Sequence, residues 1–272
     1  MTRPQVIFTS LLFMFACLIP LASQQAPPGY HLVWSDEFDG PDIDKSKWSF
    51  SVGGGGFGNN EMQWYSNKPE NSRIEGGQLV ITTLKQKMAG WPYTSAKLQT
   101  KATWTYGRVE VRAQVPKGVG SWPAIWMLPA PISDPSLSPA ELSWPTTGEI
   151  DIMEHVGFDT TLIAQTFHTG AFNFKINTQK GIRLTAPDAE TAFHVYGVDW
   201  TPEKADFLLD GEVVYTFANM HKTRQEWPFD RPFYLILNTA AGGDWGGQEG
   251  VDNASLPWNF HIDWVRVYGA DH

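Results

Sequence analysis

Three acidic residues, Glu149, Asp151 and Glu154, stand close together in the segment GEIDIMEHVG, residues 148–157. The residues around them are mostly isoleucine, methionine and valine, which favour a half-buried β-strand. Acidic side chains are rarely buried unless a partner stabilises their charge. A pair of carboxyl groups held at a fixed separation can hydrolyse a glycosidic bond, because one acts as a general acid and the other as a nucleophile or base.

The spacing of the three acids would divide them between the two faces of a regular strand. Side chains alternate along a strand, so Glu149 and Asp151 share one face and Glu154 points to the other. One extra residue, in a β-bulge at Ile152–Met153, would turn Glu154 back to the first face. The two glutamate Cα atoms would then lie roughly 13 Å apart, and their carboxyl groups about 6 Å apart with both side chains leaning inward. This separation is close to the ~5–5.5 Å of a retaining glycosidase pair.

This spacing predicts a division of roles between the acids. Glu149 would attack the anomeric carbon as the nucleophile, and Glu154 would protonate the leaving oxygen. Glu154 must keep its proton near neutral pH, and the negative charges of its two neighbours raise its pKa. Asp151 lies between the two glutamates, where we expect it to hydrogen-bond Glu149 and set its orientation.

The spacing alone leaves other interpretations open. The three acids could form a solvated face, although their apolar neighbours argue against it. They could also bind a hard cation, since carboxylate oxygens suit calcium. A zinc site made by His155 and His168 is a weaker interpretation, because no motif with metal-ligand spacing joins these two histidines.

The elements that must position the acids are strands. Apolar and β-branched runs recur along the chain, separated by Gly, Pro, Asn and Asp. One run alternates with period two, placing Val109 and Val111 on one face and Arg108 and Glu110 on the other. No segment longer than a few turns has a helical period, so the sequence predicts an all-β protein, one antiparallel β-sandwich with long loops. The expected strands include the runs 78–85, 107–115, 194–200, 205–211, 233–239 and 261–268.

The composition is that of an ordinary globular protein. The chain has 272 residues, of which 42% are hydrophobic and 18% charged, enough for one large domain. Its net charge of −9 and its pI of about 5.2 argue against a nucleic-acid partner. Thirteen tryptophans exceed the needs of a core of this size, and their flat apolar faces suit sugar rings.

The N-terminal segment has the layout of a secretory signal peptide. Arg3 precedes an apolar run from Val6 to Ile19, which small residues follow and which is too short to span a membrane comfortably. We therefore expect residues 1–23 to be removed on export to the extracellular space or the periplasm, leaving one domain over residues 27–272. Cys17 is the only cysteine, so no disulfide is expected, and its lipidation is the less favoured alternative.

The segment GEIDIMEHVG resembles the catalytic signature of glycoside hydrolase family 16 in its bulged form, E-x-D-x-x-E. The resemblance to laminarinase-type members continues in order through WSDEFDG (34–40), NNEMQWYSN (59–67), YGRVEVRAQVPKGVGSWPAIWMLP (106–129), FHVYGVDW (193–200), FYLILNTAAGGDWGG (233–247) and IDWVRVY (262–268). It implies a β-jelly roll whose concave sheet forms a glucan cleft, with endo-acting hydrolysis and retention of configuration. It also implies Glu149 as nucleophile, Glu154 as acid/base and Asp151 as assisting acid.

The same resemblance implies further residues that bind substrate. Trp122 and Trp126 are expected to form a platform beside the scissile sugar, with a place in the sandwich core as the alternative. His168 is expected to hydrogen-bond the nucleophile or the substrate, or else to be structural. The other candidates, for which a structural role is equally open, are Asn60, Arg108 and Trp245.

A structural calcium ion is also implied, on the convex side of the fold. Asp263 matches a calcium-ligand position of relatives, and backbone carbonyls near Glu37 and Gly77 would complete that site.

The loop Pro129–Thr147, rich in proline and serine, is the expected rim of the cleft.

The substrate expected from these features is a neutral β-glucan. Sulfated polymers call for Arg and Lys in the cleft, whereas this chain has 20 basic residues against 29 acidic ones. The extra Met153 separates the chain from the unbulged pattern of lichenases and xyloglucan enzymes. We expect a monomer that hydrolyses β-1,3-glucan, with mixed-linkage glucan as a second substrate. The alternatives are a family member acting on agar or carrageenan, and a glucan-binding protein that does not cut the polymer.

Overall fold

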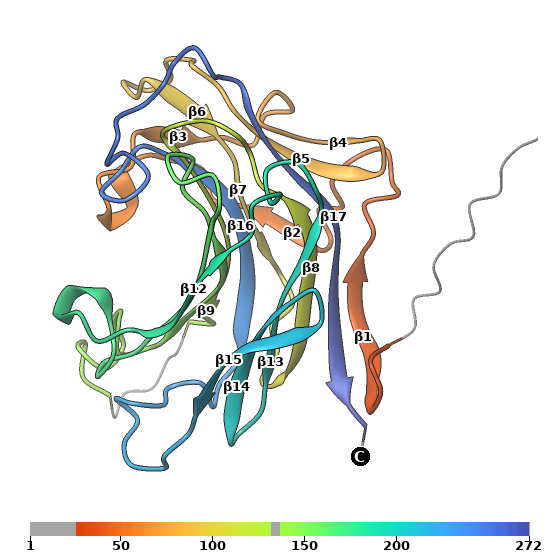
Figure 1. Ribbon diagram of the computed structural model, residues 1–272, viewed down its shortest axis with the longest axis vertical. Coiled ribbons are helices and arrows are strands. Elements are labelled where there is room, and N and C mark those ends of the chain that lie inside the picture. Colours follow the sequence, from red (N-terminus) through yellow and green to blue (C-terminus); the bar gives the residue numbers. More distant parts are fainter. Residues whose placement is uncertain (1–25, 132–136, 272) are drawn as a thin grey trace, which may run out of the picture.

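The chain folds into two antiparallel β-sheets packed face to face, in a computed structural model that describes residues 26–131 and 137–271 (Figure 1). The predicted leader, residues 1–23 with Cys17, lies outside the described residues. Within the described ranges, no helix has the length and apolar character needed to cross a membrane. The predicted all-β antiparallel sandwich is confirmed.

The sheet on the convex side, here called the outer sheet, has eight strands in the order β15-β14-β13-β8-β17-β5-β4, with β1 also pairing β17. Its strands are β1 (Tyr30–Asp36), β4 (Ser72–Glu75), β5 (Gln78–Thr83), β8 (Gly107–Gln114), β13 (His194–Trp200), β14 (Lys204–Leu209), β15 (Glu212–Ala218) and β17 (Trp258–Ala270).

The second sheet, here called the cleft sheet, has seven strands in the order β12-β11-β10-β9-β16-β7-β2. Its strands are β2 (Trp48–Phe50), β7 (Lys97–Thr100), β9 (Ser121–Pro129), β10 (Glu149–Glu154), β11 (Leu162–His168), β12 (Lys180–Thr185) and β16 (Phe233–Ala241). A parallel pair, β3 (Gln63–Tyr65) and β6 (Tyr93–Ser95), and two short 3-10 turns, η1 (Gly56–Gly58) and η2 (Phe174–Ile176), complete the described elements.

Large apolar side chains from both sheets fill the space between them. Phe167 of β11 stacks on Phe207 of β14, with ring centroids 4.1 Å apart and an interplanar angle of 13°. The alternation predicted for β8 is observed, because Val109 and Val111 are buried in this core while Arg108 points away from it. Removal of this apolar area from water is the main force that holds the two sheets together.

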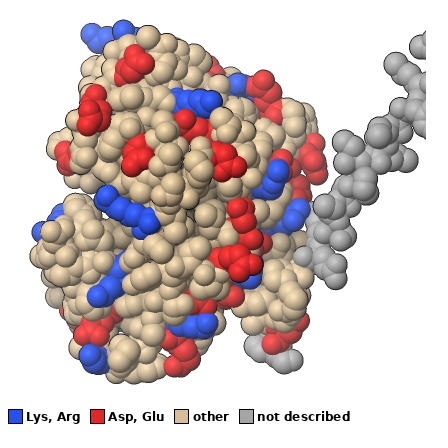
Figure 2. Space-filling view, in the orientation of Figure 1, with Lys and Arg blue, Asp and Glu red and all other residues tan. Residues whose placement is uncertain are grey.

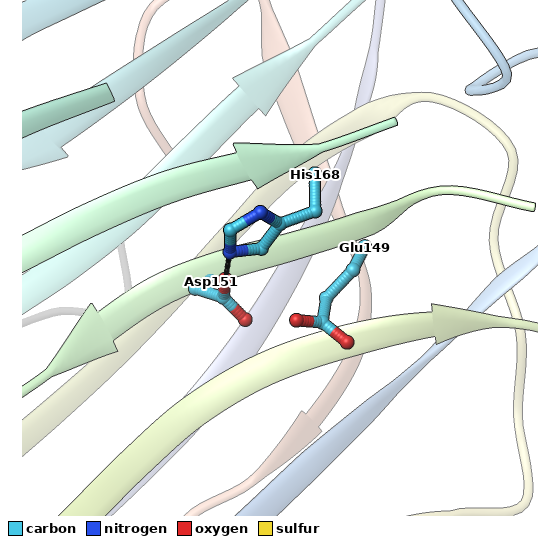
Figure 3. Close-up of side chains that lie close together, drawn as sticks. All are labelled: Glu149, Asp151 and His168. Carbon is cyan, nitrogen blue, oxygen red and sulfur yellow. Dashed lines mark ion pairs between the residues drawn. The ribbon is translucent and has the colours of Figure 1, made fainter. Parts of the chain in front are cut away.

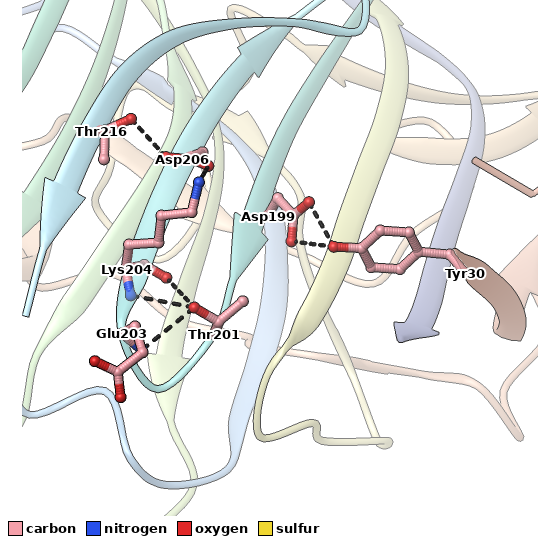
Figure 4. A network of polar contacts seen from close by, with 7 residues as sticks. All are labelled: Tyr30, Asp199, Thr201, Glu203, Lys204, Asp206 and Thr216. Atoms are coloured by element: carbon pink, nitrogen blue, oxygen red, sulfur yellow. Dashed lines mark hydrogen bonds and ion pairs between the residues drawn. The ribbon is translucent and has the colours of Figure 1, made fainter. Parts of the chain in front are cut away.

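The exposed face of the outer sheet carries a network of polar contacts (Figure 4). The Tyr30 hydroxyl of β1 lies 2.7 Å from both carboxylate oxygens of Asp199 on β13. On β14, Asp206 pairs with Lys204 and accepts a hydrogen bond of 2.6 Å from Thr216 of β15. On the side of the molecule that Figure 2 shows, Lys and Arg side chains are interspersed with Asp and Glu.

The cleft sheet curves, and its concave face points away from the core (Figure 1). The neighbouring strands β9, β10 and β16 lie in its central part. Alternate residues of these strands reach the concave face, which makes it the surface on which the three predicted acids must meet.

Candidate active site

The predicted bulge is present in β10. Towards β11 the register changes from Asp151 opposite Thr166 to Glu154 opposite Ala164, so two residues of β10 face one residue of β11. The extra pair is Ile152–Met153, and both of its side chains are fully buried in the core. Glu154 therefore returns to the concave face, where it lines the same hollow as the other two acids.

Gln165 satisfies a backbone group that the bulge frees. It is the single residue of β11 opposite the extra pair, and its side chain is fully buried. Its Nε2 donates hydrogen bonds to the carbonyl oxygens of Ile152, at 2.8 Å, and of Leu208 in the outer sheet, at 3.2 Å. A buried carbonyl without a partner costs about 1–3 kcal/mol, so this side chain stabilises the bulged conformation.

Gly148 fixes the point at which β10 begins. Its φ of +88° lies in the left-handed region that favours glycine. A Cβ at this position would lie 2.8 Å from Pro228 and 3.1 Å from Phe229. The residue directly before Glu149 must therefore be glycine for the strand to start against these rings.

His168 joins two of the acids in a compact group (Figure 3). It lies directly opposite Glu149 on β11, and its Nε2 is 3.3 Å from the Asp151 carboxylate. One side-chain atom from each of Glu149, Asp151 and His168 lies within 4.8 Å of the others. On the same face, Trp122 Nε1 donates a 3.0 Å hydrogen bond to the third acid, Glu154.

Burial is the main cause that raises the pKa of Glu149 well above its ordinary value, and the negative charge of Asp151 raises it further. His168 and Lys97 act in the opposite direction. Burial also raises the pKa of Asp151, which shares a hydrogen bond with Glu149. Two carboxyl groups can share a hydrogen bond only if one of them carries a proton, so the contact between Asp151 and Glu149 depends on one shared proton.

Burial likewise raises the pKa of Glu154. Charges on His168 and Arg183 and the hydrogen bond from Trp122 favour its ionised form and lower the pKa again. The balance leaves Glu154 a weaker acid than a solvated glutamate. A carboxyl group of this kind can hold a proton and then release it to a leaving group at moderate pH.

Lys97 is a site residue that the sequence analysis missed. Its Nζ lies 4.5 Å from the Trp126 ring centroid and 5.0 Å from that of Phe57. Burial lowers the pKa of Lys97, whereas the nearby carboxylates Glu61 and Glu149 raise it. The available signal was a lysine in the strand-like stretch YTSAKLQT, where a partly buried cation needs an acidic or aromatic partner.

A chain of hydrogen bonds holds Trp126 in place. Its Nε1 donates to Asn238 Oδ1 at 2.6 Å, and Asn238 Nδ2 donates to the Tyr65 hydroxyl at 2.9 Å. The Tyr65 hydroxyl donates in turn to Glu61 at 3.3 Å, and Gln63 donates to the same carboxylate at 2.6 Å. Fully paired polar networks of this kind fix side-chain orientation, so the face that Trp126 presents to the cleft is set by strands far away in the sequence.

Two hollows meet at the acids. The first has a volume of about 470 Å³ and the second about 500 Å³, within the range of ligand sites. Both are lined by the three acids, Asn59, Trp122 and Phe174. The first extends over Phe57, Lys97, Trp126, Trp144, Tyr234 and Asn238, and the second over His168, Gln179, Arg183, Trp245 and Gln248. Together they form a continuous cleft with the acids at its centre.

Four of the predicted substrate-binding residues line this cleft. Trp122 and Trp126 lie partly exposed on β9, and His168 and Trp245 line the second hollow. Trp245 contacts Trp122 edge to face, with centroids 5.7 Å apart. The alternative place for these two β9 tryptophans, the sandwich core, is therefore not where they lie.

The structure does not bring the other two candidates to the cleft. Arg108 lies on β8 of the outer sheet and pairs with Glu110, because it alternates with core residues of that strand. Asn60 is exposed and donates a 2.8 Å hydrogen bond to Asp244, which ties two loops together. Its neighbour Asn59 lines both hollows instead.

The residues expected to bind calcium lie together at one edge of β17. The strand β5 pairs with β17 up to Ile262 and β1 pairs with it from Val265, so Asp263 lies in the gap between these partners. Glu37 follows β1 and Gly77 precedes β5, which places both beside this gap. One Asp263 oxygen pairs with an arginine, and the Glu37 carboxylate pairs with another. Both carboxylates therefore make ion pairs, and the calcium site stays a prediction.

Among the described residues, Glu149, Asp151 and His168 form the one group of three acidic or histidine side chains close enough to hold a metal ion. The earlier zinc interpretation fails because His155 is not in this group. His155 is fully buried, with Nδ1 2.8 Å from the Leu162 carbonyl oxygen and Nε2 3.5 Å from Glu190.

Comparison with known proteins agrees with this geometry. Residues 58–266 match the model of the glycosyl hydrolases family 16. A beta-glucanase of Rhodothermus marinus is 48% identical over 250 residues, which cover 89% of this chain and 86% of that protein. A glucan endo-1,3-beta-glucosidase of Cryptopygus antarcticus is 36% identical, over 87% of this chain and 91% of its own. The X-ray structure of the laminarinase from Rhodothermus marinus superposes with a TM-score of 0.85 at 46% identity, covering 89% of this chain and 98% of that one. The chain belongs to glycosyl hydrolase family 16.

Proposed function

We propose that this chain is a retaining endo-glycosidase that hydrolyses β-1,3-glucan, with mixed-linkage β-1,3-1,4-glucan as a second substrate. The observation that carries the proposal is the bulge in β10, which puts Glu149, Asp151 and Glu154 on one face at the centre of the cleft. The beta-glucanase and the endo-1,3-beta-glucosidase among its relatives support the same substrate class.

The reaction runs in two displacements. Glu149 attacks the anomeric carbon while Glu154 gives its proton to the glycosidic oxygen, so the bond to the leaving sugar breaks and a glycosyl ester forms. Glu154 then takes a proton from water, whose oxygen attacks the same carbon and releases Glu149. Two inversions at one carbon retain its configuration.

The groups around Glu149 prepare it for the first step. A nucleophile must be ionised when it attacks, yet burial favours its neutral form. Lys97 and His168 oppose that effect, and the proton shared with Asp151 can rest on the aspartate. Asp151 therefore assists by holding a proton that would otherwise neutralise the nucleophile.

Endo-action and a neutral substrate follow from the lining of the cleft. The two hollows extend to both sides of the acids, so sugars can be held on either side of the bond that is cut. Tryptophan, phenylalanine and asparagine side chains occur along both hollows. The cations Lys97, Lys175 and Arg183 in the lining contact aromatic rings. Such a surface suits stacked neutral sugars.

A glucan-binding protein without hydrolytic activity would use the same aromatic cleft but would not need the acids. Three carboxyl groups close together under partial burial are unfavourable, since burial and like charges both raise the free energy of their ionised forms. Catalysis gives these groups a function, whereas binding alone does not.

Two further proposals come from the sequence. Secretion rests on the leader at residues 1–23, with lipidation of Cys17 as the less favoured route. A structural calcium ion at Asp263 rests on the gap between β1 and β5 and on the oxygen atoms that border it.

The activity is tested by incubating the protein with laminarin, mixed-linkage glucan and agarose while reducing ends are counted. We expect rapid release from laminarin, slower release from mixed-linkage glucan and none from agarose.

Glu149→Ala should lose several orders of magnitude in turnover, and added azide should restore cleavage by forming an α-glycosyl azide. Turnover within about tenfold of wild type, a barrier change of only ~1.4 kcal/mol, would contradict the role of Glu149.

The hydrogen bond from Trp122 to Glu154 predicts a shift in pH dependence. This bond stabilises the carboxylate, so Trp122→Phe should raise the pKa of Glu154. Because Glu154 must be protonated to act as the acid, the basic limb of the kcat/KM profile should move to higher pH. Trp126→Phe is the matched control, since its indole donates to Asn238 and that limb should stay in place. An unmoved limb in the Trp122 variant would count against Glu154 as the acid.

Deleting Met153 tests whether the extra residue of the bulge is what turns Glu154 to the same face as the other two acids. The acids would then stand at i, i+2 and i+4, which share a face of a regular strand. We expect a folded protein with altered linkage preference and kcat/KM reduced about ten- to hundredfold, or ~1.4–2.7 kcal/mol. Inserting an alanine after Met153 should turn the third carboxyl into the core and abolish both activity and folding. The explanation of the bulge would be refuted if the deletion variant were as inactive as Glu154→Ala while the insertion variant folded and kept its activity.

Calcium is tested by thermal unfolding with and without a chelator. An ion that binds only the folded state adds about 2.7 kcal/mol at a hundred times its Kd, so chelation should lower Tm. Asp263→Ala should remove that sensitivity, whereas Asp271→Ala, at the far end of β17, should keep it. A wild-type Tm that is unchanged by the chelator would rule the calcium site out.

A further inference from the structure

Two loops bring aromatic side chains together at the end of the cleft where Glu149 lies. Trp144 stands in the loop that leads into β10, and Phe174 stands in η2, after β11. The two strands are antiparallel with Glu149 opposite His168, so both loops emerge at the same end of the pair. Neither loop carries any of the three site acids.

The aromatic rings of these two loops contact one another and remain accessible to solvent. Trp144 and Phe174 have centroids 5.3 Å apart, and both contact His168, at 5.9 and 5.6 Å. Lys175 places its Nζ 4.8 Å from the Trp144 ring centroid. Phe174 nevertheless remains 47% exposed. Apolar rings that gather at the edge of a cleft and stay in contact with water mark a binding surface.

This surface is continuous with the acids. Trp144, Phe174 and Lys175 all line the first hollow together with Glu149, and Phe174 also lines the second. At the opposite end of the strands, Trp122 and Trp245 form a second aromatic wall beside Glu154. The cleft thus runs between two aromatic walls, each next to one of the two glutamates.

The η2 loop is built to keep its shape. Asn173 Nδ2 donates to the carbonyl oxygens of Thr169, at 3.1 Å, and Gly170, at 3.4 Å. The Asn173 backbone exchanges hydrogen bonds with Thr178, which closes the turn. A preorganised surface loses little conformational freedom when a ligand binds.

We propose that Trp144, Phe174 and Lys175 form a binding subsite for an additional glucosyl residue of the polymer, at the wall of the cleft next to Glu149. The apolar C–H face of the sugar stacks on the aromatic pair, and the Lys175 ammonium donates to a sugar hydroxyl. This subsite rests on the proposed glucanase function. It sets the register in which the chain lies across the acids, and therefore which bond is cut.

The test is the cleavage pattern of end-labelled laminarihexaose by Phe174→Ala. We expect kcat/KM to fall about tenfold, or ~1.4 kcal/mol, and the cut to move to a different bond of the hexasaccharide. Ile176→Ala is the matched control, because Ile176 is 57% exposed in the same turn but lines neither hollow. Its rate and cleavage pattern should equal those of the wild type.

Trp144→Ala should shift the pattern in the same direction as Phe174→Ala. An unchanged cleavage pattern in both variants would overturn the subsite, even if kcat/KM falls. A fall in rate that is equal for every bond would indicate only that these rings support His168 structurally. If Trp144→Ala does not fold, the pattern of Phe174→Ala alone decides. A wild-type protein that cuts no β-glucan refutes the proposed function instead, and this outcome is visible before any variant is made.

Discussion

The hydrogen bond from the buried Gln165 side chain to the Ile152 carbonyl oxygen is the interaction on which the site depends. An extra residue in a strand interrupts the ladder and leaves backbone groups without strand partners. In the middle of a packed sheet, water cannot replace those partners. Gln165 does so from the facing strand, and its second bond, to Leu208, connects the bulge to the outer sheet. Both Ile152 and Met153 can then fill the core while Glu154 returns to the cleft.

The position of the acids follows from this arrangement, and so does their chemistry. Carboxyl groups on one strand face of a partly buried cleft raise one another's pKa, and such a group is unfavourable for stability. The surroundings offset part of that cost through Lys97, His168 and the Trp122 indole. The surroundings of the two glutamates differ, because Lys97 acts on Glu149, whereas Arg183 and the hydrogen bond from Trp122 act on Glu154; His168 acts on both. One strand thus supplies two carboxyl groups with different electrostatic surroundings.

The alternation of side chains along strands predicted the sandwich and the shared face of the three acids, whereas their assignment as catalytic rested on the resemblance to glycoside hydrolase family 16. The same alternation predicted the bulge at Ile152–Met153, which the register of β10 and β11 confirms. Arg108 was misplaced because alternation says which face of a strand a residue occupies, but not to which of two sheets the strand belongs. Asn60 was misplaced by one position because the loop conformation, with φ of +54°, decides which of two adjacent asparagines reaches the cleft.

Other site residues were not predictable from local pattern at all. Lys97, Glu61 and Asn238 come from segments far apart in the sequence. Long-range pairing brings Lys97 and Asn238 against Trp126, and Glu61 is connected to it through Tyr65 and Asn238. No spacing rule links them, since their contacts depend on which strands become neighbours. Trp144 and Phe174 meet for a related reason, because the antiparallel pairing of β10 and β11 places their loops at one end. Long-range pairing therefore determines the lining of the cleft, while local pattern determines its catalytic centre.

The configuration of the first product tests the central claim most directly, because it depends on how far apart Glu149 and Glu154 are held. Proton NMR can follow the anomeric signals of the new reducing end during the first minutes of laminarin cleavage, before mutarotation mixes the anomers. If the bulge holds the two carboxyl groups at the ~5–5.5 Å of a retaining pair, the β-anomer will appear first and the α-anomer only later. Initial release of the α-anomer would show inversion, with a water molecule between more distant carboxyl groups, and would contradict this account of the bulged strand.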